Sequence, residues 1–122
     1  MRLYRFDPEV AHPITQFDSH GVSIGRCMRY SGDVQVGFFY IQAGGVVGFH
    51  PATVRQLFMV VTGQGWVRGD EPQRTPIRPG QAAFWEAGEQ HESGSESGMT
   101  AVVIEGDGLE PERYMPELHL EP

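Results

Sequence analysis

Turn signals recur at short intervals along this chain, and they restrict its possible folds more than any other feature. Turns rich in glycine fall at residues 31–33, 44–45, 62–65, 69–70, 79–80, 87–88 and 94–98. The segments between them are rich in β-branched and aromatic residues and lie at 34–41, 56–61, 66–68, 82–85 and 99–104. Many short strands separated by such turns are typical of an all-β sandwich or barrel. No window between turns keeps a 3.6-residue apolar period, so we expect little helix.

Several of the expected strands are apolar on both sides. In 56–62, Phe58 and Val60 lie on one side, and Leu57 and Met59 lie on the other. The segment 34–42 is apolar on both sides in the same way, whereas a half-solvated strand would alternate with polar residues. We therefore expect these strands to face the barrel interior on one side. The other side would be covered by a second sheet, by the partner subunit of a homodimer, or by the ends of the chain.

The charge of the chain argues against several classes of partner. The formal net charge is −7, and no two of the nine basic residues are adjacent. Binding to nucleic acid or to an anionic membrane surface needs clustered Lys and Arg, so neither is expected. The first residues lack an apolar leader and no apolar run reaches the length of a membrane span, which predicts a cytoplasmic protein. A chain of 122 residues predicts one domain over 1–122.

The most informative stretch of the sequence runs from residue 44 to residue 63. Five residues separate Gly44 from His50, Ala52 is two positions further on, Gln56 follows after three residues, and Gly63 follows after six. This pattern resembles the first motif of the cupin superfamily, in which a glycine precedes His-x-His, then a glutamate, then a second glycine. Every spacing of that motif is kept.

A second stretch, sixteen residues further on, resembles the second cupin motif. That motif is a glycine, five residues, Pro-x-Gly, two residues, histidine, three residues and asparagine. Its positions are taken by Gly80, Glu86, Gly88, His91 and Ser95. Two motifs in order and in register, inside a chain that reads as all-β, make a fairly specific match over residues 34–106. The resemblance implies a double-stranded β-helix, or jelly-roll, barrel.

The segment 107–122 is an acidic C-terminal tail interrupted by proline. Its apolar residues either dock on the barrel or a neighbouring subunit, or the tail frays at the chain end. These residues are Tyr114, Met115, Leu118 and Leu120.

The departures from the first motif concern the metal site that the resemblance implies. In metal-binding cupins the two histidines and the glutamate of the first motif, with the histidine of the second, hold one divalent metal inside the barrel. Here Ala52 removes one imidazole, and Gln56 puts a neutral amide in place of the carboxylate. A stable first-row metal site normally has three or four suitable ligands. The remaining set, His50, Gln56 and His91, predicts a weakened site for zinc, iron, manganese or nickel.

The same three residues are candidates for binding a small molecule. Gln56 is the only strongly polar residue in an apolar run, and burying an unpaired amide costs a few kcal/mol. We therefore expect Gln56 to form a hydrogen bond with His50, with His91 or with a ligand.

Other candidate ligand-binding residues are aromatic or acidic. Phe38, Tyr40, Phe58 and Trp85 are candidates to line a cavity, although aromatic residues in a small barrel are more often core. Glu86 stands where the second motif has proline and ends an apolar strand, which makes it a candidate at the rim of the pocket. The acids nearer to His91 are expected to be solvated turn residues; they are Glu89 and Glu92.

Three functions are compatible with these residues. The first is a small-molecule binding protein with a pocket around His50, Gln56 and His91. The second is a metal-dependent enzyme of the dioxygenase or isomerase type that uses the reduced ligand set. The third is metal-free acid–base catalysis with a histidine as the base, as in sugar-nucleotide epimerases of this fold. The absence of a clear Arg or Lys cluster for a substrate phosphate weakens the third.

Overall fold

The computed structural model describes residues 1–119, in which short strands account for most of the regular structure. The strands are β1 (Arg2–Arg5), β2 (His12–Pro13), β3 (Ser23–Ile24), β4 (Gln35–Ile41), β5 (Val46–Pro51), β6 (Gln56–Gly63), β7 (Gly65–Arg68), β8 (Thr75–Ile77), β9 (Gln81–Trp85), β10 (Gln90–Gly94), β11 (Met99–Glu105) and β12 (Glu117–Leu118). The helices are single 3-10 turns at η1 (Pro8–Val10), η2 (Gln16–Asp18) and η3 (Pro111–Arg113).

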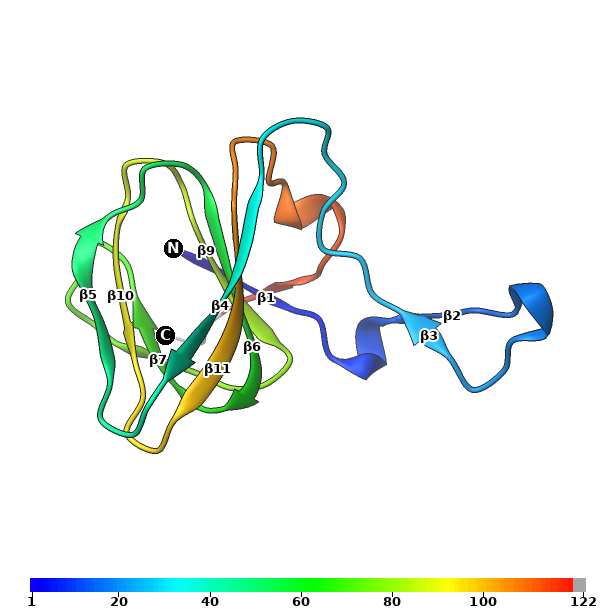
Figure 1. Cartoon of the computed structure of the whole chain (residues 1–122), viewed down its shortest axis with the longest axis horizontal. Helices are drawn as coiled ribbons and strands as arrows, with labels where there is room; N and C mark the ends of the chain where they lie inside the picture. Colours follow the sequence, from blue (N-terminus) through cyan, green and yellow to red (C-terminus); the bar gives the residue numbers. More distant parts are fainter. Residues whose placement is uncertain (120–122) are drawn as a thin grey trace.

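Two antiparallel sheets form the barrel (Figure 1). The six-stranded sheet has the order β12-β1-β9-β6-β11-β4, and the four-stranded sheet has the order β5-β10-β7-β8. Apart from β7 and β8, the neighbouring strands in both sheets are non-consecutive in sequence, as in a jelly roll, whose strands pair across the barrel. The predicted all-β, double-stranded β-helix class is confirmed.

The expected strands match β4, β6, β7, β9 and β11, with boundaries shifted by one or two residues. The prediction did not include β5, β8 or β10 as strands. Their sequences, VVGFHP, TPI and QHESG, are interrupted by glycine, proline or polar residues. They are strands because barrel closure pairs them with neighbours, so tertiary context outweighs their weak local preference.

The interior of the barrel is filled by side chains of alternating strand positions. In β6, Phe58 and Val60 point inward and meet Val67 of the facing sheet, and Trp85 of β9 and Ala101 of β11 join the same cluster. Each of these residues is at most 1% exposed. Burial of such side chains contributes about 1.5 to 3 kcal/mol each for the larger ones, which makes this cluster the main stabilising element.

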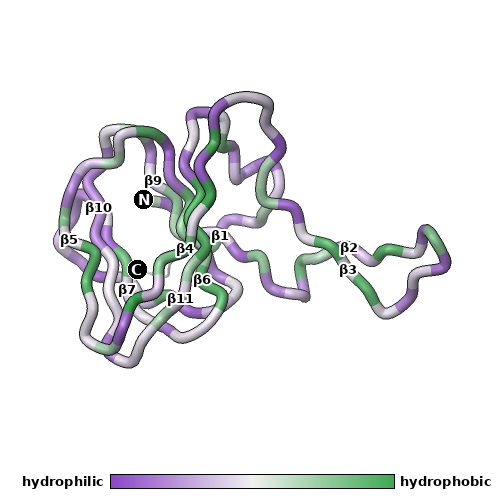
Figure 2. The backbone as a smooth tube through the Cα atoms, viewed as in Figure 1, coloured by the Kyte–Doolittle hydropathy of each residue, from purple (hydrophilic) through white to green (hydrophobic). Residues whose placement is uncertain are grey.

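A second apolar cluster covers part of the outer face of the six-stranded sheet. Leu57 and Phe84 on the sheet pack with Leu109 and Met115 from the C-terminal segment. Tyr114 also contacts this cluster, and Leu118 pairs with Leu3 across β12 and β1. The tail therefore docks on the barrel of its own chain, while Leu120 lies outside the described residues. Figure 2 shows apolar residues along β4, β6 and β11 of this sheet.

The outer face of β4 is not covered in the same way. Val36, Phe38 and Tyr40 are 56%, 60% and 75% exposed, and only the inward positions of β4 reach the core. The expectation that 34–42 is covered on both faces is therefore wrong within this chain, because the docked tail covers the opposite half of the sheet. Among residues 1–119, no helix is long and apolar enough to cross a membrane.

Candidate functional site

His50 and His91 face each other at one end of the barrel. The strands β5 and β10 are hydrogen-bonded neighbours, and their register places His91 directly opposite His50. The two imidazole centroids are 4.2 Å apart, with the ring planes inclined by 53°. A register shift between His91 and Ser93 accompanies this pairing, so that Val47 still faces the core. The two histidines that the motif spacing picked out are therefore side by side.

His50 is exposed, and a contact with the backbone defines its tautomer. Its Nδ1 lies 2.5 Å from the carbonyl oxygen of Gly48. A carbonyl oxygen only accepts hydrogen bonds, so Nδ1 carries the proton and donates it. The other nitrogen, Nε2, then has a free lone pair. His50 can therefore accept a hydrogen bond from a ligand, or take a proton, at Nε2.

His91 is buried against the core, at 3% exposure. Its ring centroid is 4.8 Å from that of Trp85, which is fully buried and donates its indole N–H to the carbonyl of Arg68 at 3.2 Å. The Nδ1 atom of His91 is buried and has no hydrogen-bond partner among the described residues. Burial lowers the pKa of His91, and the neighbouring charge of His50 lowers it further, against smaller opposing effects from Glu89 and Glu105.

The pKa shift of His91 predicts a loss of stability in acid. Because the folded pKa lies below the ordinary value of 6.5, the unfolded chain binds more protons between the two values. The contribution of neutral His91 is therefore fully present above pH 6.5 and is lost as pH falls through the folded pKa. We expect the free energy of unfolding, measured in urea, to fall more steeply between pH 7 and pH 5 for the wild type than for His91→Gln. If the free energies of unfolding of the two proteins fall in parallel over this pH range, the pKa of His91 does not contribute to acid sensitivity.

Gln56 is buried beside the carboxylate of Glu105, which lies outside both motifs. Its Nε2 donates to Oε1 of Glu105 at 2.9 Å, and the two residues are opposite each other on β6 and β11. The expectation of a hydrogen bond from Gln56 to a histidine is therefore wrong, since Glu105 takes that place. Glu105 lies on the same face of β11 as Ala101 and Val103, because alternate residues of a strand share a face, and this face is the interior one. That shared face is the signal that could have identified it.

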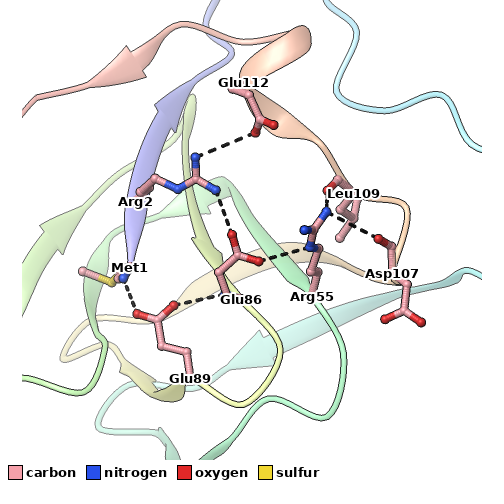
Figure 3. A network of polar contacts seen from close by, with 8 residues as sticks. All are labelled: Met1, Arg2, Arg55, Glu86, Glu89, Asp107, Leu109 and Glu112. Carbon is pink, nitrogen blue, oxygen red and sulfur yellow. Dashed lines mark hydrogen bonds and ion pairs between the residues drawn. The ribbon is translucent and has the colours of Figure 1, made fainter.

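Glu86 forms ion pairs at the rim of the barrel and does not contact the histidines. Its carboxylate lies 3.2 Å from Arg2 and 3.1 Å from Arg55 (Figure 3). Arg55 also donates to the carbonyl of Leu109 at 3.0 Å, and Arg2 reaches Glu112 at 3.8 Å. Glu86 was predicted to bind a ligand in the pocket, but its carboxylate is used in these ion pairs. The network links β1, the turn between β9 and β10, and the C-terminal segment.

The other two acids near His91 are also engaged. Glu89 accepts from the amino group of Met1 and from the backbone N–H of Glu86, and Glu92 pairs with Arg68 at 3.6 Å. Neither raises the pKa of His91 above its ordinary value, because burial has the larger effect.

The four aromatic candidates divide into two pairs. Phe58 and Trp85 point inward, with centroids 6.1 Å apart, and Trp85 lies directly behind His91. Phe38 and Tyr40 lie on the outer face of β4, stacked on each other with centroids 6.3 Å apart. The prediction that Phe38 and Tyr40 line the pocket is wrong, because both faces of this strand are apolar and the sequence gives no sign of which one is inside.

The residues present do not fit the metal centre that the fold suggests. Ala52 is 5% exposed and packs where the motif places an imidazole, and the amide nitrogen of Gln56 faces Glu105. Among residues 1–119, no group of three or more His, Cys, Asp or Glu side chains is arranged to hold a metal ion. Two imidazoles are fewer ligands than a stable zinc or iron site uses.

A separate hollow of about 640 Å³ lies near the other end of β10. Gln64, Trp66, Arg78 and Glu96 are among the residues that line it. None of the predicted site residues lines this hollow, so it is distinct from the histidine pair.

Comparison with solved structures identifies the fold. No family model and no curated protein matches the sequence. A cupin superfamily protein from Desulfitobacterium hafniense superposes with a TM-score of 0.57 at 16% identity, over 86% of this chain and 97% of that one. An uncharacterised protein with a double-stranded β-helix domain from Klebsiella pneumoniae gives 0.57 at 18% identity, over 74% and 81%. A predicted oxalate decarboxylase from Thermotoga maritima gives 0.52 at 18% identity, over 57% and 62%.

These similarities define the class of protein: the chain has the cupin fold. The motif resemblance and the structural neighbours agree on this point. Within that fold, the chain keeps one histidine of each motif and lacks the other metal ligands of the first.

Proposed function

We propose that this protein binds a small molecule rich in hydroxyl or N–H groups at the barrel end formed by His50 and His91, without a metal. The observation that carries the proposal is the pairing of the buried ring of His91 with the exposed ring of His50, whose Nε2 is free to bind a ligand. Because His50 is exposed, a ligand can approach the pair from solvent.

The class of ligand follows from the hydrogen-bonding groups at this end. Nε2 of His50 is an acceptor, and the second oxygen of Glu105 accepts as well. The oxygen of Gln56 is a third acceptor, because its amide nitrogen already faces Glu105. Acceptors on His50, Glu105 and Gln56, at the same end of the barrel, favour a ligand that brings several donors, such as a neutral sugar or polyol.

Anionic ligands are less well matched to this site. The arginines at this end of the barrel, Arg2, Arg55 and Arg68, each face a carboxylate of Glu86 or Glu92. A phosphate or carboxylate would have to compete with those carboxylates and would approach Glu105 as a like charge. This disfavours the sugar-nucleotide reaction that requires phosphate recognition.

Isothermal titration against matched panels tests the proposal. One panel contains neutral monosaccharides and polyols, and the other contains the corresponding sugar phosphates and sugar acids. We expect saturable binding of at least one neutral compound, and at least a tenfold loss of affinity in His50→Ala. His20→Ala, which removes another exposed histidine, serves as the control and should bind like the wild type. Binding confined to the anionic panel, or binding unchanged in His50→Ala, would overturn the proposal.

Metal analysis of the untagged protein distinguishes the proposal from the metal-dependent alternative. We expect much less than one equivalent of zinc, iron, manganese or nickel per chain, and sugar binding that survives treatment with a chelator. One equivalent of tightly held metal that disappears in both His50→Ala and His91→Ala would favour a metal-dependent enzyme.

A further inference from the structure

The hollow of about 640 Å³ near the end of β10 is a second place where a small molecule can bind. Residues of β7, β8 and β9 line it, together with the turns that follow β6, β8 and β10. Its volume lies within the range of about 300 to 1,000 Å³ that is usual for ligand sites. His91 is near the start of β10, whereas Glu96 and Ser97 of the hollow follow the last residue of that strand. The hollow and the histidine pair are therefore at opposite ends of β10.

The indole of Trp66 forms a fixed apolar wall of the hollow. Trp66 on β7 is opposite Gly94 on β10, and a Cβ added at Gly94 would lie only 2.5 Å from a carbon of the indole. The indole therefore lies directly on the backbone of Gly94, an approach that only glycine allows. The guanidinium of Arg74 lies over the indole, with its central carbon 3.7 Å from the ring centroid. Pro76 is opposite Trp66 on β8 and extends this wall.

Two charged side chains of opposite sign also line the hollow, and neither has an ion-pair partner within residues 1–119. They are Arg78, in the turn after β8, and Glu96, in the turn after β10. Most arginines of the chain do form ion pairs within those residues; they are Arg2, Arg5, Arg55, Arg68 and Arg113. An unpaired cation and an unpaired anion around one hollow favour a ligand that carries both charges.

Gln81 adds a hydrogen-bond donor next to Arg78. Its Oε1 accepts from the backbone N–H of Arg78 at 3.3 Å, so its amide nitrogen can donate to a ligand. The guanidinium of Arg78 is a planar fork of N–H groups that matches the shape of a carboxylate. The donors therefore lie beside the turn between β8 and β9, and the acceptor Glu96 lies in the turn between β10 and β11.

We propose that this hollow binds a free α-amino acid with an apolar side chain. Arg78 and Gln81 hold the carboxylate, and Glu96 holds the ammonium. The side chain of the amino acid lies against Trp66 and Pro76. A phosphate or a dicarboxylate would approach Glu96 as a like charge, and a neutral sugar would leave both charged groups unpaired. This binding is independent of ligand binding at the histidine pair, which does not line the hollow.

Isothermal titration with L-leucine and two analogues tests the class of ligand. N-acetyl-L-leucine lacks the ammonium, and L-leucinamide lacks the carboxylate. We expect saturable binding of L-leucine and at least tenfold weaker binding of each analogue, because each leaves one charge of the hollow unpaired. Arg78→Gln should bind L-leucine as weakly as it binds L-leucinamide. Glu96→Gln should bind L-leucine as weakly as it binds N-acetyl-L-leucine.

Arg26→Gln and Glu71→Gln are the matched controls. Both side chains are exposed, form no ion pair within residues 1–119 and do not line the hollow. Both controls should bind L-leucine like the wild type, and thermal melts should show that all four variants stay folded. The proposal is refuted if L-leucine does not bind, if the analogues bind as tightly as L-leucine, or if Arg78→Gln and Glu96→Gln keep the affinity of the wild type.

The indole N–H signals of the two tryptophans in a proton–nitrogen NMR spectrum locate the bound amino acid. Trp66→Phe assigns them, because it removes one of the two signals. We expect L-leucine to shift the signal of Trp66 and to leave that of Trp85 unchanged, since Trp85 is buried beside His91. A shift confined to Trp85 would place L-leucine at the histidine pair and contradict a site in this hollow. Sugar binding at the histidine pair should be the same with and without L-leucine, so either site can fail its test without the other.

Discussion

Trp85→Ala is expected to be the most destabilising single truncation in the barrel. Trp85 is fully buried, packs edge-on to Phe58 with centroids 6.1 Å apart, and contacts His91. Removing a buried indole of this size leaves a cavity, and such changes cost about 3 to 5 kcal/mol. The free energy of unfolding of a small domain is about 5 to 15 kcal/mol, so the variant should be largely unfolded at modest urea concentrations.

Urea unfolding of Trp85→Ala and Phe49→Ala gives the comparison. Phe49 is 46% exposed on the outer side of the four-stranded sheet, where Arg68 lies 4.1 Å above its ring. Its loss should cost no more than about 1 kcal/mol, because only a partly exposed cation–π contact is removed. If both variants lose the same small part of the free energy of unfolding, Trp85 does not stabilise the core beside His91.

Gly63→Ala is expected to have the second large effect. Gly63 has a φ of +74°, and a Cβ there would overlap the carbonyl oxygen of Gly98 and lie 2.8 Å from Cα of Met99. The left-handed conformation costs a non-glycine residue roughly 1 to 2 kcal/mol. Displacing the backbone of β11 adds a similar amount or more, by analogy with overpacked cores. The combined loss should be about 3 kcal/mol and should disturb the β6–β11 pairing.

Gly44→Ala separates these two contributions. Gly44, the first glycine of the same motif, has a φ of +80°, but a Cβ there would meet no atom within 4 Å. Its replacement should therefore cost only the conformational part, about 1 to 2 kcal/mol. Chemical unfolding of both variants in one buffer provides the measurement. Equal losses would mean that the close approach of Gly63 to β11 has no energetic importance.

The sequence was sufficient to predict the fold and the meeting of the two histidines. The glycine turns and the β-rich segments indicated the fold class, and the resemblance of the two motifs to those of cupins implied that His50 and His91 lie together. Strands β5 and β10 were not expected, since their polar and glycine-rich sequences form strands only through their neighbours. Local pattern carries no information about such pairing.

The rest of the site depends on facts that a linear pattern does not contain. Phe38 and Tyr40 share a face, but periodicity alone does not say whether that face is inside when both are apolar. Glu105 follows an apolar run and lies outside both motifs, so its position beside Gln56 becomes evident only from the β6–β11 register. Residues 8–24 have no strand pattern of their own, because the two strands there, β2 and β3, are two residues long each.

Nitrogen-15 NMR of the two imidazoles, recorded in the presence of a chelator during titration with a neutral sugar, is the most direct test of the binding site. We expect neutral His91 near pH 7, because burial lowers its pKa. As the sugar saturates the protein, the Nε2 resonance of His50 should shift, and the ring resonances of the neighbouring His91 should change with it. If the resonances of both rings stay unchanged until a divalent metal replaces the chelator, a metal-free binding site at this end of the barrel is contradicted.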